Sequence, residues 1–363
     1  MCPSPRRNLL SPSATGSVGL LIGAFLFAVS NTLAKTIYFR GVSLATLFLI
    51  RGVVVYALNA LRVFVQRGRA EALRVAALRV GGRRLVAMCV ARSACGFVGI
   101  AMLNVAFMLM NFADAFALSL GTLCLSTIFF ARVCLGRAER LSWRAAIGVV
   151  LALIGIVFVA QPKALFDGVP PSALGTLLGI VSGTLFGTFG IFSRVLGRAG
   201  AASPPMLVSY YMVVIEVGTA GLALLALALG PETAPPWAIP AWPTHDGRAA
   251  AEAAALVALY CLTILSGQLL LAFGNGRLQA GRAAVLALSE LGFAWLCGVV
   301  VLREATNALA CVGTLAIFVG SALAATAAAP PTTPAKLADA DAAAAASKED
   351  WTPATEPEPG DRL

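Results

Sequence analysis

The chain has 363 residues, of which 59% are hydrophobic and only 12% are charged, and its mean hydropathy is +0.86. This composition lies far outside the range of soluble globular domains, so it predicts a membrane protein. The formal net charge of +10 does not indicate nucleic-acid binding, because no soluble face combines basic with aromatic residues.

Ten apolar segments follow one another along the chain, and a membrane-spanning helix needs about 20 such residues. Proline, glycine or charged residues separate these segments. The first five are expected at 16–35, 42–65, 85–110, 112–135 and 144–161, and the second five at 173–194, 205–229, 250–274, 279–302 and 305–327. The sequence therefore predicts an all-α membrane protein with ten transmembrane helices.

The two ends of the chain differ in composition from the apolar segments. Residues 1–15 include the basic start "MCPSPRRNLL", which resembles a signal peptide. The first apolar segment is long and lacks a convincing cleavage site, so an uncleaved first helix is expected. Residues 328–363 are rich in proline, alanine and acids, which predicts a disordered acidic tail.

The distribution of charge predicts the orientation. Residues 67–84 contain six arginines and one acid, and the connection at 132–144 is also basic, so both are expected on the cytoplasmic side. The connections at 163–172 and 230–249 are neutral or slightly acidic, which suits the opposite side, and both termini are then cytosolic. The basic segment 67–84 could alternatively lie on anionic lipid as an interfacial helix.

Four glycines recur at every fourth position in "GTLLGIVSGTLFG", from Gly175 to Gly187. In water each would cost a helix about 1 kcal/mol relative to alanine. In a bilayer the backbone must stay helical, and small residues at this spacing let a second helix approach closely. The pattern predicts a membrane helix with a grooved packing face, near the interface between the two halves of the protein.

The two halves of the chain show internal similarity. A shift of 160 residues superposes Gly19 and Gly23 on Gly179 and Gly183. A shift of 165 residues aligns Glu139 with Glu304, Gly148 with Gly313, and Gly155 with Gly320. Two such close offsets suggest a duplicated unit of five spans, at 16–161 and 173–327. Because five is odd, the second copy enters the membrane from the opposite side, as in the inverted repeats of secondary transporters.

The first half contains "FADAFALSLGTLCLSTIFF" and the second "LGTLLGIVSGTLFGTFGIFSR". In their order and spacing these stretches resemble the two EamA-type repeats of the drug/metabolite transporter superfamily, in its "ADA" variety. The resemblance extends from Gly16 to about Ala325. It implies a carrier with a 5+5 inverted repeat of ten helices, cytosolic termini and a central cavity. The sequence departs from many relatives in lacking a proline midway in "TLCLST".

Ionisable side chains at membrane depth cost about 2.5 to 3.5 kcal/mol, so they usually line a cavity or pair with a partner. The candidates are Arg51, Arg92, Asp114, Glu216, Arg282 and Glu290. Glu290 and Glu216 are candidates for proton or substrate coupling, because burial favours a carboxyl group that loads and releases a proton. The alternative is a structural carboxylate paired permanently with one of the three arginines.

Other polar residues have alternative interpretations too. Asp114 suits the N-terminus of the fourth helix, although the resemblance places this position on the translocation path. Arg51 could hold an anionic group of a substrate or neutralise an acid. Asn31 and Asn104 could contact a solute, but amides at this depth more often bond across helices. Glu139, like Glu304, is expected to be structural, capping the following helix and pairing with neighbours such as Arg140.

Several chemistries are excluded by the residues present. His245 is the single histidine, so a histidine-rich metal site and a Ser/His/Asp triad are not expected. There is no phosphate-binding "GxxxxGK[ST]" motif, and the eight cysteines form no CxxC pair. Neither a cofactor nor a metal is expected, and the chain offers no features of an enzyme.

Two function classes remain. The first is a secondary carrier that moves a small organic metabolite or drug-like solute by alternating access, with proton coupling as one option. The second is a membrane-integral scaffold or enzyme without transport activity. The sequence leaves open the solute, the oligomeric state, with a homodimer among the options, and whether the membrane is the plasma membrane or an organellar one.

Overall fold

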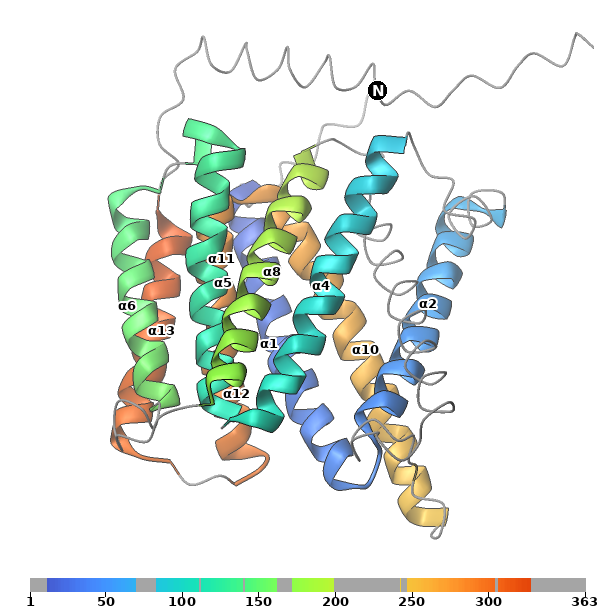
Figure 1. The fold of residues 1–363 in the computed structure, drawn as a ribbon. Helices are drawn as coiled ribbons and strands as arrows, with labels where there is room; N and C mark the ends of the chain where they lie inside the picture. Colours follow the sequence, from blue (N-terminus) through green and yellow to red (C-terminus); the bar gives the residue numbers. More distant parts are fainter. Residues whose placement is uncertain are drawn as a thin grey trace, which may run out of the picture.

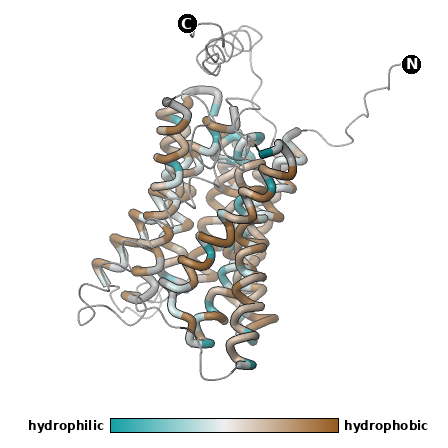
Figure 2. The backbone as a smooth tube through the Cα atoms, turned by 90° about the vertical axis from the view of Figure 1, so that its right-hand side faces the viewer, coloured by the Kyte–Doolittle hydropathy of each residue, from teal (hydrophilic) through white to brown (hydrophobic). Residues whose placement is uncertain are grey.

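The computed structural model describes residues 12–69, 83–110, 112–139, 141–161, 172–198, 242, 247–303 and 306–327. Within these ranges the chain is helical and has no β-strand, and eight helical segments are long and apolar enough to cross a membrane. Hydrophobic residues run along most of the helices (Figure 2). The protein is therefore an all-helical, multi-pass membrane protein, which confirms the prediction from composition. The segment expected at 205–229 and the tail at 328–363 lie outside the described residues.

Each of the five segments expected in the first half is a helix. They are α1 (Pro12–Phe39), α2 (Leu44–Arg67), α4 (Arg83–Leu109), α5 (Phe112–Cys134) and α6 (Trp143–Ala160), with a short 3₁₀ helix, η1 (Gly136–Glu139), between the last two (Figure 1). Serine side chains start two of them: Ser43 Oγ accepts a hydrogen bond from the Thr46 amide, and Ser142 Oγ accepts one from the Ala145 amide. The stretch "TLCLST" lies within α5, which continues through it without a break.

The described helices of the second half are α8 (Ala173–Arg198), α10 (Gly247–Arg277), α11 (Ala280–Ala287), α12 (Ser289–Val300) and α13 (Ala308–Thr326). The single span expected at 279–302 is divided at Leu288 into α11 and α12. Leu288 itself keeps helical dihedral angles, φ −61° and ψ −22°, so the division is a local irregularity within one span. Asn307 starts α13 by accepting a hydrogen bond from the Ala310 amide at 2.9 Å.

Four glycines form the crossing between α6 and α13. A Cβ atom added at Gly148 would lie 2.6 Å from the Gly320 carbonyl oxygen, and one added at Gly155 would lie 2.5 Å from the Gly313 carbonyl oxygen. The two backbones are therefore in direct contact, and the helices run antiparallel. The shift of 165 residues aligns Gly148 with Gly313 and Gly155 with Gly320. Each glycine thus contacts the counterpart of the other, which is the reciprocity that a two-fold axis produces.

Two further helix pairs each join one helix of the first half to one helix of the second half. Helix α1 packs antiparallel along α10, with Gly23 next to Leu271 and the Gly267 carbonyl group. Helix α4 packs antiparallel along α8, where Ser182 Oγ donates to the Gly99 carbonyl oxygen at 2.8 Å. The first helix of each half therefore packs against the helix expected third in the other half.

The glycine stripe of α8 forms the face that packs against α5. A Cβ atom at Gly183 would lie 2.8 Å from Thr122 Cβ and 2.9 Å from the Leu123 nitrogen, in addition to a still closer approach to the Ser119 carbonyl oxygen. Gly187 faces Ser126 and Thr127 in the same way. The four-residue spacing thus brings two membrane helices into backbone contact, as small residues do in lipid.

The bundle has two ends, which we name after a residue at each. At the Glu139 end, α5 and α8 finish, α6 begins, and the chain passes from α10 into α11. At the Arg40 end, α1 finishes close to the start of α10, because Arg40 forms an ion pair with Glu252. Helix α8 therefore ends at one end of the bundle, and the next described helix, α10, begins at the opposite end (Figure 1).

Candidate functional site

A cavity of about 310 Å³ lies inside the bundle. Residues of α1, α2, α4, α5, α8, α10, α11 and α12 line it, so both halves of the chain contribute. On α1 the lining runs from Leu20 to Tyr38, and at the Glu139 end it includes Asn275 and Ala280. Most of the lining is apolar, with a small number of polar groups, which is the usual composition of a site for a small organic molecule.

Glu290 and Asn31 meet in this cavity. Asn31 Nδ2 on α1 donates a hydrogen bond to Glu290 Oε1 on α12 at 2.9 Å. Glu290 belongs to the first turn of α12, two residues after Leu288, and negative charge is favourable at the N-terminal turn of a helix. Among the described residues, no lysine or arginine forms an ion pair with Glu290. The alternative interpretation, in which Glu290 is a structural carboxylate paired with an arginine, is therefore not supported by the described residues.

Basic and aromatic groups line the same cavity. Lys35 lies one helical turn after Asn31 on α1. Arg51 on α2 is 1% exposed, and its Nη1 donates to the hydroxyl oxygen of Tyr260 on α10 at 2.8 Å. The Arg51 guanidinium also lies 4.5 Å from the centre of the Phe48 ring. Aromatic faces stabilise a desolvated guanidinium, so Arg51 is held in the cavity wall by groups from two helices.

Three other candidates lie outside the cavity lining. Arg92 is buried between α4 and α8, where its Nε donates to Ser193 Oγ at 2.7 Å and its guanidinium stacks 3.9 Å from the Phe189 ring centre. Arg282 donates to the Ala324 carbonyl oxygen at 2.9 Å and to that of Ala325 at 2.6 Å. Asp114 is buried in the first turn of α5. Arg282 thus binds the C-terminal end of α13, an arrangement that stabilises a helix.

Two candidates cannot be placed. Glu216 lies outside the described residues, and so does the side chain of Asn104. Sequence reasoning did not select Lys35, Phe48 or Tyr260 for the site. A signal existed for Lys35, because it lies four residues after Asn31 and therefore on the same face of the helix. Tyr260 could have been noticed as a hydroxyl group deep in an apolar span, where it requires a partner.

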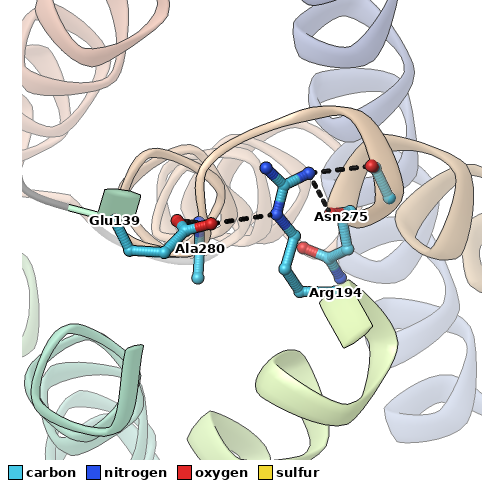
Figure 3. A network of polar contacts seen from close by, with 5 residues as sticks. Glu139, Arg194, Asn275 and Ala280 are labelled. Carbon is cyan, nitrogen blue, oxygen red and sulfur yellow. Dashed lines mark hydrogen bonds and ion pairs between the residues drawn. The ribbon is translucent and has the colours of Figure 1, made fainter. Parts of the chain in front are cut away.

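Glu139 and Arg194 form a buried network at the Glu139 end of the cavity (Figure 3). Arg194 Nε lies 3.2 Å from Glu139 Oε1, and the Ala280 amide donates to Glu139 Oε2 at 2.7 Å. Arg194 Nη1 also donates to the carbonyl oxygens of Gly276, at 2.8 Å, and Asn275, at 3.5 Å. The network joins η1 to α8 and to the connection between α10 and α11.

These contacts correct the expectation for Glu139. Its carboxylate caps α11, far along the chain, whereas the following helix α6 is capped by Ser142. Among the described residues it forms an ion pair with Arg194. Arg140 and Glu304 lie outside the described residues, so the expected pairing with Arg140 stays a prediction. In the described part of the chain, seven cysteines are free thiols and no three metal-binding side chains cluster.

No family model and no curated protein matches the chain. A solved structure described as "Crystal structure of protein" resembles it with a TM-score of 0.61 and 19% sequence identity, over 86% of this chain and 96% of that one. At this level of identity the likeness shows the fold alone. The arrangement of helices is therefore one that a known structure shares.

Proposed function

We propose that the protein is a secondary carrier that moves a small organic metabolite or drug-like solute across a membrane by alternating access. The observation that carries the proposal is the cavity, which lies between helices of both halves and contains the hydrogen-bonded pair Glu290 and Asn31. Ionisable side chains inside a membrane bundle cost free energy, so their presence around a cavity favours a functional site. Its volume is at the lower end of the range for small-molecule sites, which is about 300 to 1,000 Å³.

The proposal includes a 5+5 inverted repeat of ten helices, as the resemblance to the drug/metabolite transporter superfamily implies. The reciprocal contacts of Gly148 with Gly320 and of Gly155 with Gly313 support a pseudo-two-fold axis between the halves. The positions of α8 and α10 support a span between them, because the chain must pass from the Glu139 end to the Arg40 end. The segment expected at 205–229 would supply it.

Inverted repeats suit a carrier for a physical reason. Two similar bundles in opposite orientations have two equivalent packing arrangements, one open to each side, and the solute site lies between them. Glu290 is the group we assign to proton coupling, because a carboxyl group in an apolar cavity can load and release a proton during such a cycle. The membrane-integral scaffold or enzyme is the second candidate, and no arrangement of the described residues specifically favours it.

The test is counterflow of small organic solutes in proteoliposomes that contain the purified protein. We expect at least one solute to exchange, and Glu290→Gln to lose the dependence of uptake on a pH gradient. Glu252→Gln, at an exposed carboxylate that does not line the cavity, is a matched control that should behave as the parent protein. If a broad panel of solutes shows no exchange, the carrier proposal is wrong. If Glu290→Gln responds to pH as the parent does, Glu290 is not the coupling group.

A further inference from the structure

We propose that the ion pair between Glu139 and Arg194 is the gate that closes the cavity at the Glu139 end. The inference rests on the proposed carrier function, because a gate requires a solute path to close. It assigns a conformational role to two residues that do not themselves contact the Glu290 site.

The pair is placed where a gate must act. Glu139 belongs to η1 in the first half of the chain, while Arg194 and Ala280 belong to the second half. Asn275 and Ala280, whose backbone groups bond to the pair, also line the cavity. The network therefore joins the two halves where the cavity lining reaches the Glu139 end of the bundle. Opening this end requires Glu139 to release both Arg194 and Ala280.

The local electrostatics favour one closed arrangement. Arg194 binds carbonyl groups at the C-terminal end of α10, and Glu139 binds an amide at the N-terminal start of α11. Each charge thus contacts the helix end of opposite partial charge. Glu139 is 4% exposed and Arg194 is 9% exposed, so water cannot replace these contacts one at a time. A buried pair with several partners either stays intact or separates as a unit, which is the behaviour of a two-state element.

The opposite end of the bundle has a different ion pair. Arg40, directly after α1, and Glu252 on α10 also join the two halves. Their side chains alone are 47% and 41% exposed, whereas the side chains of Arg194 and Glu139 are 11% and 0% exposed. The cavity extends towards this end as far as Tyr38, which is 47% exposed. Among the described residues, the halves are thus joined by a buried ion pair at the Glu139 end, and by an exposed ion pair and the hydrogen bonds between Gln161 and Asn307 at the Arg40 end.

The test measures access to the cavity and does not depend on transport. In a chain whose eight cysteines are replaced, Thr127→Cys provides one thiol in the cavity wall, next to Gly190 and close to the Glu139 end. A membrane-impermeant thiol reagent is added from each side. We expect labelling from the side of the Arg40 end, and little from the other side. Glu139→Gln keeps an oxygen for the Ala280 amide but removes the charge, so labelling from the side of the Glu139 end should rise severalfold.

Arg40→Gln is the matched control, since it breaks the pair at the opposite end and should leave labelling from the side of the Glu139 end unchanged. If Glu139→Gln does not remain monodisperse, Arg194→Lys provides a second variant, which keeps the charge but offers one nitrogen where Arg194 uses two, Nε for Glu139 and Nη1 for the carbonyl groups. Unchanged labelling in folded Glu139→Gln and Arg194→Lys would overturn the gate. An equal rise in Arg40→Gln would also overturn it. A shift in labelling without exchange of any solute would instead remove the carrier function and leave the conformational role.

Discussion

Glu290 on α12 accepts a hydrogen bond from Asn31 on α1 at 2.9 Å, although 259 positions separate the two residues in the chain. The bond joins the first helix of one half to the broken span of the other, inside the cavity. The irregularity at Leu288 places Glu290 in the first turn of α12. The geometry thus couples the one carboxylate in the described cavity lining to the contact between the two halves.

Asn31→Ala should impair the cavity without unfolding the protein. A hydrogen bond to a charged group contributes about 1.5 to 3 kcal/mol, and without it Glu290 is no longer held in its position in the cavity, so the KM of a transported solute should rise severalfold. The measurement is concentration-dependent uptake in proteoliposomes. Ser30→Ala is the control, because the Ser30 hydroxyl bonds only to the Phe27 carbonyl oxygen of its own helix. Equal KM values for the two variants would show that Asn31 has no role in the site.

The sequence predicted the helices more completely than the site. Hydropathy over about 20 residues is a local property, and the expected spans agree with α1, α5 and α13 to within a few residues at most ends. The division at Leu288 was not predicted, because no proline or glycine marks it. The contacts of Glu139 with Arg194 and Ala280 were not predictable either, since both residues are distant in the chain and only the packing of the halves brings them together.

Gly183→Ala should destabilise the packing of α8 on α5. The added Cβ would lie less than 3 Å from Thr122 and Leu123, so the helices must separate or distort, at a cost of about 1 to 3 kcal/mol. Gly121→Ala is the control on α5, because its nearest neighbour, Leu153 Cδ2, would be 3.9 Å away. Thermal unfolding in detergent should show a lower midpoint for Gly183→Ala only. Equal midpoints would mean that α5 and α8 adapt to the methyl group freely.

The crossing of α6 and α13 offers a test of the proposed pseudo-two-fold axis. Gly148→Ala and Gly313→Ala occupy equivalent positions, where the new Cβ atoms would lie 2.6 and 2.7 Å from carbonyl oxygens of the facing helix. We therefore expect both variants to be destabilised, by similar amounts of about 1 to 3 kcal/mol. The comparison of their unfolding midpoints is informative because each substitution alone has many explanations, whereas matched losses require matched surroundings. A loss confined to one of them would contradict the symmetry.

Arg282→Gln should lower stability without affecting the solute, which distinguishes a structural arginine from one in the cavity wall. Arg282 donates to the carbonyl oxygens of Ala324 and Ala325, and its loss removes charge-assisted bonds of about 1.5 to 3 kcal/mol from the end of α13. The unfolding midpoint should therefore fall, while the KM of a transported solute stays unchanged at a temperature where the variant is folded. Arg51→Gln is the comparison, because Arg51 lines the cavity and its substitution should raise the KM of the solute. A raised KM in folded Arg282→Gln would show that the end of α13 affects the solute site.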